Sequence, residues 1–144
     1  DVNSIFIERS DEIIPVDVAT NVHPGFPTDL QAQWISLMSI CKGKAKMVEN
    51  IYHDRFSHIP ELNRLGANIS LDKNIATING VTILIGAEVM STDIRASASL
   101  VLASLCAEGK STISRVYHID RGYEKIEEKF QKLGAEINCR QGQG

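Results

Sequence analysis

The sequence is poor in cysteine and contains no long apolar run. Its three cysteines are an odd number, lie far apart and lack the paired spacing of metal ligands, so we expect reduced thiols instead of a disulfide framework. No stretch approaches the roughly 20 apolar residues that a membrane-spanning helix needs, and the sequence does not open on a charged and then apolar leader. We therefore expect a cytoplasmic protein that makes no membrane contact.

An excess of positive charge is also missing. The 15 Lys and Arg residues are fewer than the 18 Asp and Glu residues, and the resulting net charge of -3 argues against a nucleic-acid partner. The spacing of the four histidines matches no common pattern of metal ligands, so we expect neither a metal nor another cofactor. With 144 residues, of which 43% are apolar, the chain is long enough to form one compact domain with a sizeable core.

What the sequence does contain is an internal repeat. Three motifs occur twice and in the same order: Thr-Asp-Leu/Ile at 28–30 and 92–94, Tyr-His followed by Asp-Arg at 52–55 and 117–121, and Leu-Gly-Ala at 65–67 and 133–135. Matches at a slowly drifting offset indicate two copies of one supersecondary unit that differ by small insertions. Because charged residues are among those repeated, the repeat is expected to carry function as well as fold.

Each unit is expected to have the order β, α, β, α, β, β, which places the fold in the α/β (α+β) class. Alternating apolar residues and turn signals predict strands at 4–8, 13–19, 46–52, 68–71, 76–78, 81–85, 112–117 and 136–140. Apolar residues at helical spacing predict helices from Thr28 to before Gly43 and at 54–65, 92–107 and 120–133. We assign residues 1–27 to the end of a preceding unit and a linker, 28–85 to one repeat unit and 86–144 to the next.

Two details of these helices can be tested against a structure. Thr28 as N-cap and Gln31 three residues later have the pattern of a capping box. The Ala/Ser-rich stretch at 96–104 has the composition of a phosphate-binding loop but lacks its glycines and lysine. We therefore interpret this stretch as a helix whose small residues let a neighbouring helix approach closely.

The charges at the predicted helix starts suggest a ligand. Asp29 and Asp93 suit the partial positive charge of a helix N-terminus, but Arg55, Arg95 and Arg121 do not. Arginines at these positions are useful if an anion binds between the guanidinium groups and the backbone N–H donors. The pattern favours a small polyanionic ligand. The alternative is that each arginine only pairs with a neighbouring aspartate or folds over the surface.

Three longer segments carry a family resemblance: Pro-Gly-Phe-Pro-Thr-Asp-Leu-Gln-Ala-Gln at 24–33, Ser-Thr-Asp-Ile-Arg-Ala-Ser-Ala at 91–98 and Tyr-His-Ile-Asp-Arg-Gly-Tyr-Glu at 117–124. They resemble the C-terminal part of the UDP-N-acetylglucosamine 1-carboxyvinyltransferases, enolpyruvyl transferases that begin peptidoglycan synthesis. The resemblance runs over essentially the whole chain. It implies an enolpyruvyl-transferase-like domain, an inside-out α/β barrel of three βαβαββ units, which is incomplete here. Because the chain starts at Asp1 instead of Met, we expect a piece of a longer protein whose N-terminal half is its necessary partner.

The resemblance also implies a reaction. The 3-hydroxyl of UDP-N-acetylglucosamine adds to C2 of phosphoenolpyruvate, and phosphate then leaves. Asp29 matches the carboxylate that touches this hydroxyl, and the backbone of Ile51 matches a position that helps to bind the UDP-sugar. The arginines match those that bind the carboxylate and phosphate of phosphoenolpyruvate, and Asp93 matches an acid near the reacting centre. The implied substrate-binding residues are Thr28, Asp29, Ile51, Arg55, Asp93, Arg95 and Arg121, of which Asp29, Arg95 and Arg121 are the catalytic ones.

The sequence also departs from the family. Family members use a lysine near their N-terminus and a mobile loop, usually with a cysteine, and neither segment is in this sequence. Cys41 and Cys106 lie late in predicted apolar helices and Cys139 in a predicted terminal strand. We interpret all three as core or edge residues and not as that catalytic thiol. We expect the chain alone to have no transferase activity and to self-associate through exposed strand edges. Two alternatives remain: a 3-phosphoshikimate 1-carboxyvinyltransferase, and a binding module that keeps the repeat without the reaction.

Overall fold

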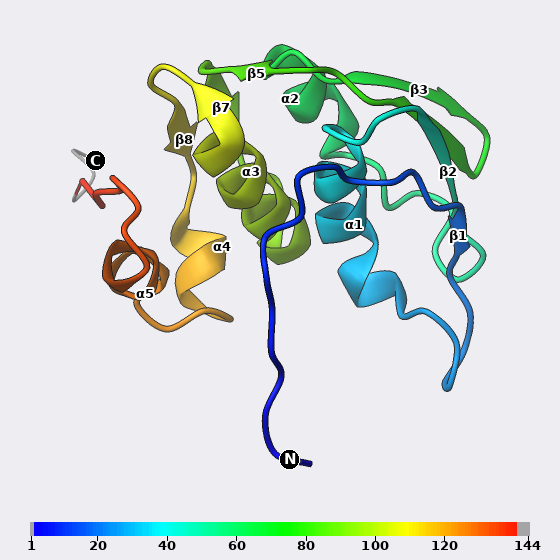
Figure 1. Ribbon diagram of the computed structural model, residues 1–144, viewed down its shortest axis with the longest axis horizontal. Helices are drawn as coiled ribbons and strands as arrows, with labels where there is room; N and C mark the ends of the chain where they lie inside the picture. The colour runs from blue at the N-terminus through cyan, green and yellow to red at the C-terminus, as the bar shows by residue number, and fades with distance from the viewer. Residues whose placement is uncertain (1, 141–144) are drawn as a thin grey trace.

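The computed structural model describes residues 2–140, and a four-stranded sheet forms one side of the molecule (Figure 1). The strand order is β1-β2-β4-β3, in which β1 runs parallel to β2 and the other neighbours are antiparallel. Alternate residues of β2 and β4 are fully buried, so one face of this sheet covers the core. The strands are β1 (Val18–Ala19), β2 (Lys44–Val48), β3 (Asn68–Asp72) and β4 (Ile75–Asn79).

The other strands form two short parallel pairs. β5 (Leu84–Ile85) pairs with β7 (Ala107–Glu108), and β6 (Glu88–Met90) pairs with β8 (Thr112–Ser114). The connection from β6 to β8 contains helix α3, just as the connection from β1 to its parallel neighbour β2 contains helix α1. The same parallel β-α-β arrangement therefore occurs in both halves of the sequence, while the unit limits at 28–85 and 86–144 stay predictions.

Helices α1 (Gln31–Met38) and α3 (Ile94–Cys106) lie side by side and begin at the same end of the molecule (Figure 1). The face of α3 that is buried consists largely of alanine and serine, and the hydroxyl of Ser36 in α1 donates a hydrogen bond to the carbonyl of Ser99 at 2.7 Å. A side chain can reach the backbone of a neighbouring helix only where small residues separate the two. The predicted close approach of a small-residue helix is thus confirmed.

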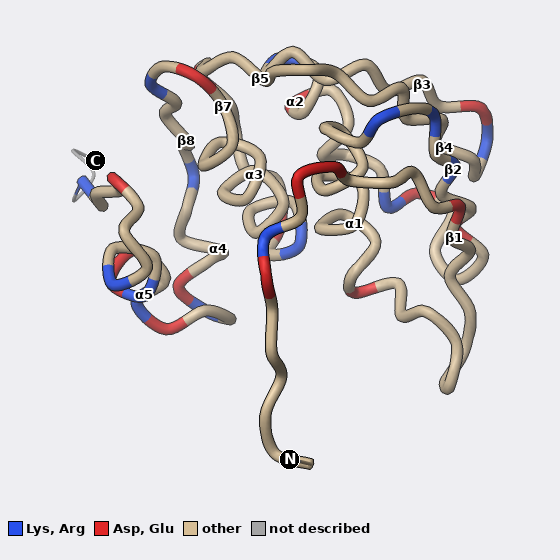
Figure 2. The backbone as a smooth tube through the Cα atoms, viewed as in Figure 1, with Lys and Arg blue, Asp and Glu red and all other residues tan. Residues whose placement is uncertain are grey.

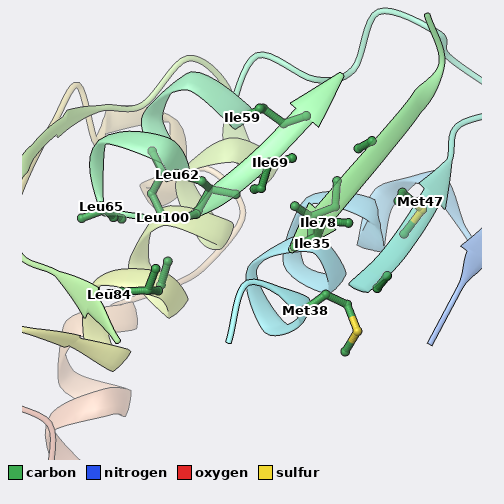
Figure 3. Packing of buried hydrophobic residues seen from close by; sticks show 14 of the residues in the cluster. Ile35, Met38, Met47, Ile59, Leu62, Leu65, Ile69, Ile78, Leu84 and Leu100 are labelled. Atoms are coloured by element: carbon green, nitrogen blue, oxygen red, sulfur yellow. The ribbon is translucent and has the colours of Figure 1, made fainter. Parts of the chain in front are cut away.

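The remaining helices are short: η1 (Thr28–Leu30), a turn of 3-10 helix before α1, and α2 (Ile59–Arg64), α4 (Tyr117–Asp120) and α5 (Ile126–Lys132). The core lies between the four-stranded sheet and helices α1, α2 and α3 (Figure 3). Its fully buried side chains include Ile35, Met38, Met47, Leu62, Leu65, Ile78, Leu84 and Leu100. In the described part of the chain, no helix is both long and apolar enough to cross a membrane.

The predicted terminal strands are wrong. Residues 4–8 and 136–140 form no strand, and of 13–19 only β1 is a strand. A strand requires a neighbouring strand to pair with, and among the described residues none pairs with 4–8 or 136–140. The N-terminal arm instead leaves the molecule in an extended course (Figure 1), with Ile5, Phe6 and Ile7 more than 85% exposed. The strand predicted at 112–117 ends at Ser114, because Arg115 adopts a left-handed φ of 59° and α4 follows.

Several helix boundaries also differ from the prediction. The helix expected at 54–65 begins only at Ile59, after a series of turns. Of the helix expected at 120–133, the part that forms is α5, which begins only at Ile126 after Lys125 with its left-handed φ of 48°, while α4 ends at Asp120. The capping box is wrong as well: Thr28 makes no side-chain cap, since its hydroxyl bonds a buried carboxylate described below.

The three cysteines are free, as expected. Cys41 is buried in the core, and this burial raises the pKa of its thiol, so its predicted role as a core residue is confirmed. Cys106 is exposed because it is the last residue of α3, where the helix leaves the core, so it is an edge residue and not a core residue. Cys139 is exposed in a segment that is not a strand.

Candidate functional site

The repeated Thr-Asp motifs lie at the adjacent starts of α1 and α3. Asp29 belongs to η1, immediately before α1, and Asp93 is the N-cap of α3. The Oδ1 atom of Asp93 accepts hydrogen bonds from the backbone N–H groups of Arg95 at 2.8 Å and Ala96 at 2.9 Å. Asp93 therefore closes the first turn of α3, a structural task worth about 1 kcal/mol. It also fixes the backbone from which the Arg95 side chain extends.

Asp29 binds two arginines through a single oxygen. Its Oδ1 atom accepts a hydrogen bond from Nε of Arg95 at 2.7 Å and another from Nη1 of Arg55 at 3.2 Å. The hydrogen bond from Arg95 is the main reason that the pKa of Asp29 lies below its ordinary value, with the charges of Arg95 and Arg55 adding to it and partial burial opposing it. Asp29 is an ionised acid with a weakly basic carboxylate.

Arg55 is fixed from two further sides. Its guanidinium carbon lies 3.8 Å from the centre of the Tyr52 ring, in a cation–π contact, and Nη1 also approaches the hydroxyl of Thr28 at 3.4 Å. Charged residues of both signs are spread along the chain (Figure 2). The grouping of Asp29, Arg55 and Arg95 is therefore local and is not the result of one strongly charged face. Arg55 and Arg95 do pair with an aspartate, as the alternative interpretation of the sequence expected. This aspartate, Asp29, is distant in the sequence and is not a neighbour of either arginine.

Glu49, a residue that the sequence analysis did not select, holds this site together. Its side chain is completely buried and accepts hydrogen bonds from the hydroxyls of Thr20 at 2.5 Å and Thr28 at 2.6 Å. It also accepts from the backbone N–H groups of Ile51 at 3.0 Å and Tyr52 at 3.3 Å. Burial by itself would raise the pKa of Glu49, but these hydrogen bonds outweigh it and lower the pKa, so the carboxylate is ionised.

A signal for Glu49 was present in the sequence. Ala45 and Met47 are the buried residues of β2, and the period of two along a strand places Glu49 on the same inward face. An acid on a core-facing strand position must find hydrogen-bond donors. Its partners could not be read from the sequence, because they come from three other segments.

A cavity of about 40 Å³ lies beside the ion pairs. Its lining combines residues selected from the sequence with Gln31, Ala32 and His58, which were not selected: Thr28, Gln31, Ala32, Arg55, His58, Asp93 and Arg95. His58 is only 3% exposed, and burial is the main reason that its pKa falls to about 4, with the charge of Asp93 opposing this shift. His58 is therefore neutral at physiological pH.

The other two selected residues lie outside this cavity. Ile51 is half-buried in the turn after β2 and its N–H group is bonded to Glu49, as described above. Arg121 is exposed at the C-terminal end of α4, and within the described residues its side chain has no hydrogen bond or ion pair. Its predicted position at a helix start is therefore wrong, because the helix begins at Tyr117, earlier than expected. The backbone nevertheless passes close to α3, since a Cβ on Gly122 would overlap the Ile94 side chain.

The described residues contain no group of side chains with the composition of a metal site. Among residues 2–140, no three His, Cys, Asp or Glu side chains are grouped closely enough to hold an ion. The site instead combines two guanidinium groups, the carboxylate of Asp93 and a neutral imidazole around a small cavity, with the carboxylate of Asp29 bonded to both guanidinium groups. Such a set can bind an anionic ligand through the arginines and a hydroxyl group through the neutral and acidic acceptors.

Comparisons with known proteins give the site a context. A sequence model of the family EPSP synthase (3-phosphoshikimate 1-carboxyvinyltransferase) matches residues 1–130. The chain is 56% identical over 136 residues to the UDP-N-acetylglucosamine 1-carboxyvinyltransferase of Pelodictyon phaeoclathratiforme, a match that covers 94% of this chain and 32% of that protein. It is 61% identical over 122 residues to the protein of the same name from Magnetococcus marinus, with 85% and 29% covered. The chain thus spans about a third of the length of these curated relatives.

Solved structures agree with this fold. The enolpyruvyl transferase NikO from Streptomyces tendae matches with a TM-score of 0.81 and 30% identity, over 88% of this chain and 29% of that chain. An EPSP synthase from Acinetobacter baumannii matches with a TM-score of 0.53 and 16% identity, over 69% of this chain and 23% of that chain, which shows a likeness of fold alone. The predicted enolpyruvyl-transferase-like α/β fold class is confirmed.

Proposed function

The chain belongs to the EPSP synthase (3-phosphoshikimate 1-carboxyvinyltransferase) family, and from that premise we propose that it is part of an enzyme that transfers enolpyruvyl from phosphoenolpyruvate to the 3-hydroxyl of UDP-N-acetylglucosamine. The acceptor is the one that appears in the names of the curated relatives. The observation that carries the proposal is the carboxylate of Asp29 between two arginines at the edge of one cavity.

In the proposed reaction the 3-hydroxyl gives up its proton to Asp29 as its oxygen forms a bond to C2 of phosphoenolpyruvate, and an acid from the part of the enzyme outside this chain donates a proton to C3. The bond from C2 to the phosphate oxygen then breaks, phosphate leaves with the electron pair, and C3 loses a proton to restore the double bond. Asp29 accepts a hydrogen bond from the 3-hydroxyl through Oδ2, which has no hydrogen bond among the described residues, because both arginines use Oδ1. The lowered pKa of Asp29 makes it a weak base, so its contribution lies mainly in orienting the hydroxyl.

The arginines bind the donor. Phosphoenolpyruvate carries a carboxylate and a phosphate, and guanidinium groups form charge-assisted, bidentate hydrogen bonds with both kinds of anion. Arg55 and Arg95 are already held in place by Asp29, Tyr52 and the first turn of α3. We propose that Arg121 adds a third guanidinium and that Thr28, Asp93 and the backbone of Ile51 complete the binding of the substrates.

A phosphate-release assay on the complete protein tests the proposal. With phosphoenolpyruvate and UDP-N-acetylglucosamine we expect turnover, and Asp29→Asn should lower kcat at least about 100-fold. Asp72→Asn is the matched control, since Asp72 is an exposed residue at the end of β3 and should leave turnover unchanged. Turnover only with shikimate 3-phosphate would contradict the acceptor, and a folded protein without turnover on either acceptor would favour a binding module.

Substrate binding separates the roles of the residues. Arg121→Ala in the complete protein should weaken phosphoenolpyruvate binding and leave UDP-N-acetylglucosamine binding largely intact. An equal loss of both would contradict the donor-binding role of Arg121. The 144-residue chain by itself should show no turnover, because its site lies in a cleft whose other side is supplied by the rest of the enzyme. We further propose that the complete protein acts in the cytoplasm, at the first committed step of peptidoglycan synthesis.

A further inference from the structure

Two buried polar atoms in the lining of the cavity have no hydrogen-bond partner within the described residues. They are Oε1 of Gln31 and Nε2 of His58. Gln31 is 1% exposed and His58 is 3% exposed, so bulk water does not reach either side chain freely. Buried polar atoms are nearly always paired, and each exception requires an explanation.

The orientation of the Gln31 amide is fixed by its surroundings. Its Nε2 atom donates to the carbonyl of Arg55 at 2.9 Å and approaches Oε1 of Glu49 at 3.4 Å. A flipped amide would place the oxygen of Gln31 against these two acceptors, one of which is an ionised carboxylate. The unpartnered Oε1 is therefore a consequence of the network around Glu49 and not of an arbitrary assignment.

The occupant that satisfies both atoms is a neutral hydroxyl group. Oε1 of Gln31 can only accept, so the occupant must donate a hydrogen bond, which an ionised carboxylate or phosphate oxygen cannot do. A cation would donate, but Arg55 and Arg95 line the same cavity and repel it. A hydroxyl group or a water molecule donates to Gln31 and bonds the neutral imidazole of His58, in either tautomer of the ring.

The size of the cavity agrees with this occupant. Its volume of about 40 Å³ exceeds the roughly 10–15 Å³ that one buried water requires. The cavity also borders Thr28, which precedes Asp29 in the sequence, and Arg95, which donates a hydrogen bond to Asp29. A sugar that presents one hydroxyl to Asp29 has further hydroxyls within reach of this position.

We propose that Gln31 and His58 form a binding site for one hydroxyl group, which donates to Oε1 of Gln31 and bonds Nε2 of His58. The identity of the ligand rests on the proposed function: the hydroxyl belongs to the acceptor sugar in the complex, and a water molecule replaces it in the free protein. Gln31 and His58 are then residues that recognise the acceptor. They do not touch the reacting atoms.

The first experiment is a crystal structure of the complete, ligand-free protein at a resolution that shows ordered water. We expect a water within about 3 Å of both Oε1 of Gln31 and Nε2 of His58. An empty cavity, or a Gln31 amide whose oxygen has another partner, would overturn the proposal. This arm does not depend on the reaction, so it tests the site even if the proposed transferase function fails.

The second experiment measures the affinity of the complete protein for UDP-N-acetylglucosamine by calorimetry. His58→Phe and Gln31→Met should each weaken binding about tenfold, the loss expected for one hydrogen bond, while His58→Gln should restore part of it. His53→Phe and Gln33→Met are the matched controls, because His53 is exposed and Gln33 does not line the cavity. Unfolding midpoints of all variants identify any that fail to fold. If either His58→Phe or Gln31→Met does not fold, the affinity of the other variant tests the proposal.

The outcomes separate the two sources of the hydroxyl. The site is assigned to the sugar if both variants bind UDP-N-acetylglucosamine more weakly than the wild-type protein does. In addition, removing one sugar hydroxyl in UDP-monodeoxysugar analogues should weaken binding less in these variants than in the wild-type protein. Equal affinities with the water retained in the complex assign the hydroxyl to water and still support the site. Equal affinities with the cavity empty in both structures overturn the proposal. If the wild-type protein does not bind the UDP-sugar at all, the proposed function fails and the water alone decides this inference.

Discussion

The carboxylate of Asp29 accepts a hydrogen bond from Nε of Arg95 at 2.7 Å, although 66 residues separate the two in the sequence. Asp29 lies at the start of α1 and Arg95 in the first turn of α3, the equivalent helices of the two parallel β-α-β arrangements. The contact thus joins the two halves of the chain at the place where their repeated Thr-Asp motifs meet. The effect of this contact can be measured as a change in the pKa of the Asp29 carboxyl group.

Replacing Arg95 should raise the pKa of Asp29. Arg95→Gln removes the hydrogen bond and the charge that contribute most to the lowered pKa, so the pKa should move up toward its ordinary value of 3.8. Arg55→Gln should raise it less, since the bond from Arg55 is longer, at 3.2 Å. The measurement is an NMR titration of the Asp29 side-chain carbonyl. Arg64→Gln is the control, because Arg64 pairs with Glu61, and an equal shift in this variant would contradict the assignment.

Replacing Glu49 should destabilise the protein strongly. Glu49→Ala leaves the hydroxyls of Thr20 and Thr28 and the N–H groups after β2 without their acceptor inside the protein. We expect the free energy of unfolding to fall by about 3–5 kcal/mol, and by less in Glu49→Gln, which keeps the shape and one acceptor oxygen. Urea unfolding gives both values.

The control for this change is Glu88→Ala. Glu88 is an exposed acid on β6, and its side chain has no hydrogen bond within the described residues, so the expected change is within about 0.5 kcal/mol. A Glu49→Ala variant as stable as this control would show that these four donors bind water instead, and that Glu49 does not hold the site together.

The neutral, buried His58 should make stability depend on pH. Its pKa is about 4 in the folded protein and 6.5 in the reference state, so between these values the unfolded chain binds a proton that the folded chain does not. Stability is therefore fully present above pH 6.5 and falls as the pH decreases toward 4. From pH 7.5 to 5 the loss from His58 alone should be about 2 kcal/mol. Urea unfolding at both pH values measures it.

The comparison variant for this prediction is His58→Gln, which keeps a polar side chain but does not titrate. Its stability should fall by about 2 kcal/mol less over the same interval. Asp29 and Glu49, whose pKa values are lowered, change the free energy of unfolding only below this interval. The stability that they contribute is lost only as the pH falls below their ordinary pKa values of 3.8 and 4.5. The same pH dependence in both proteins would contradict the neutral state of His58.

Two glycines near these elements should differ in their tolerance of alanine. A Cβ on Gly80 would overlap the backbone carbonyl of Cys41, which is held at the end of α1, so Gly80→Ala should cost about 3 kcal/mol. A Cβ on Gly122 would meet only the tip of the flexible Ile94 side chain, and this side chain can change its rotamer at a cost of about 1 kcal/mol. Thermal unfolding of both variants measures the difference, and the reverse order would contradict this account.

The sequence alone predicted those features that depend on residues close together in the sequence. The small residues at 96–104 set the close approach of α3 to α1, because their size is a local property that no partner changes. The repeated motifs contain Thr28, Asp29, Arg55 and Asp93, and Arg95 directly follows one of them. All of these except Asp29 line the same cavity, while Asp29 bonds both arginines. Repetition predicted this meeting, since two copies of one unit present the same helix ends.

The tertiary structure decided the rest. Glu49 and His58 were not selected, because a buried polar residue is recognised by its partners, and those of Glu49 come from three segments of the chain. The terminal strands were wrong because a strand exists only with a partner, whatever its own alternation of residues. Arg121 does not line the cavity that Arg55 and Arg95 share, and it follows the end of α4 instead of lying at the helix start that its sequence pattern indicates. Local sequence thus determined which residues could serve the site, and long-range hydrogen bonds and packing determined which of them meet there.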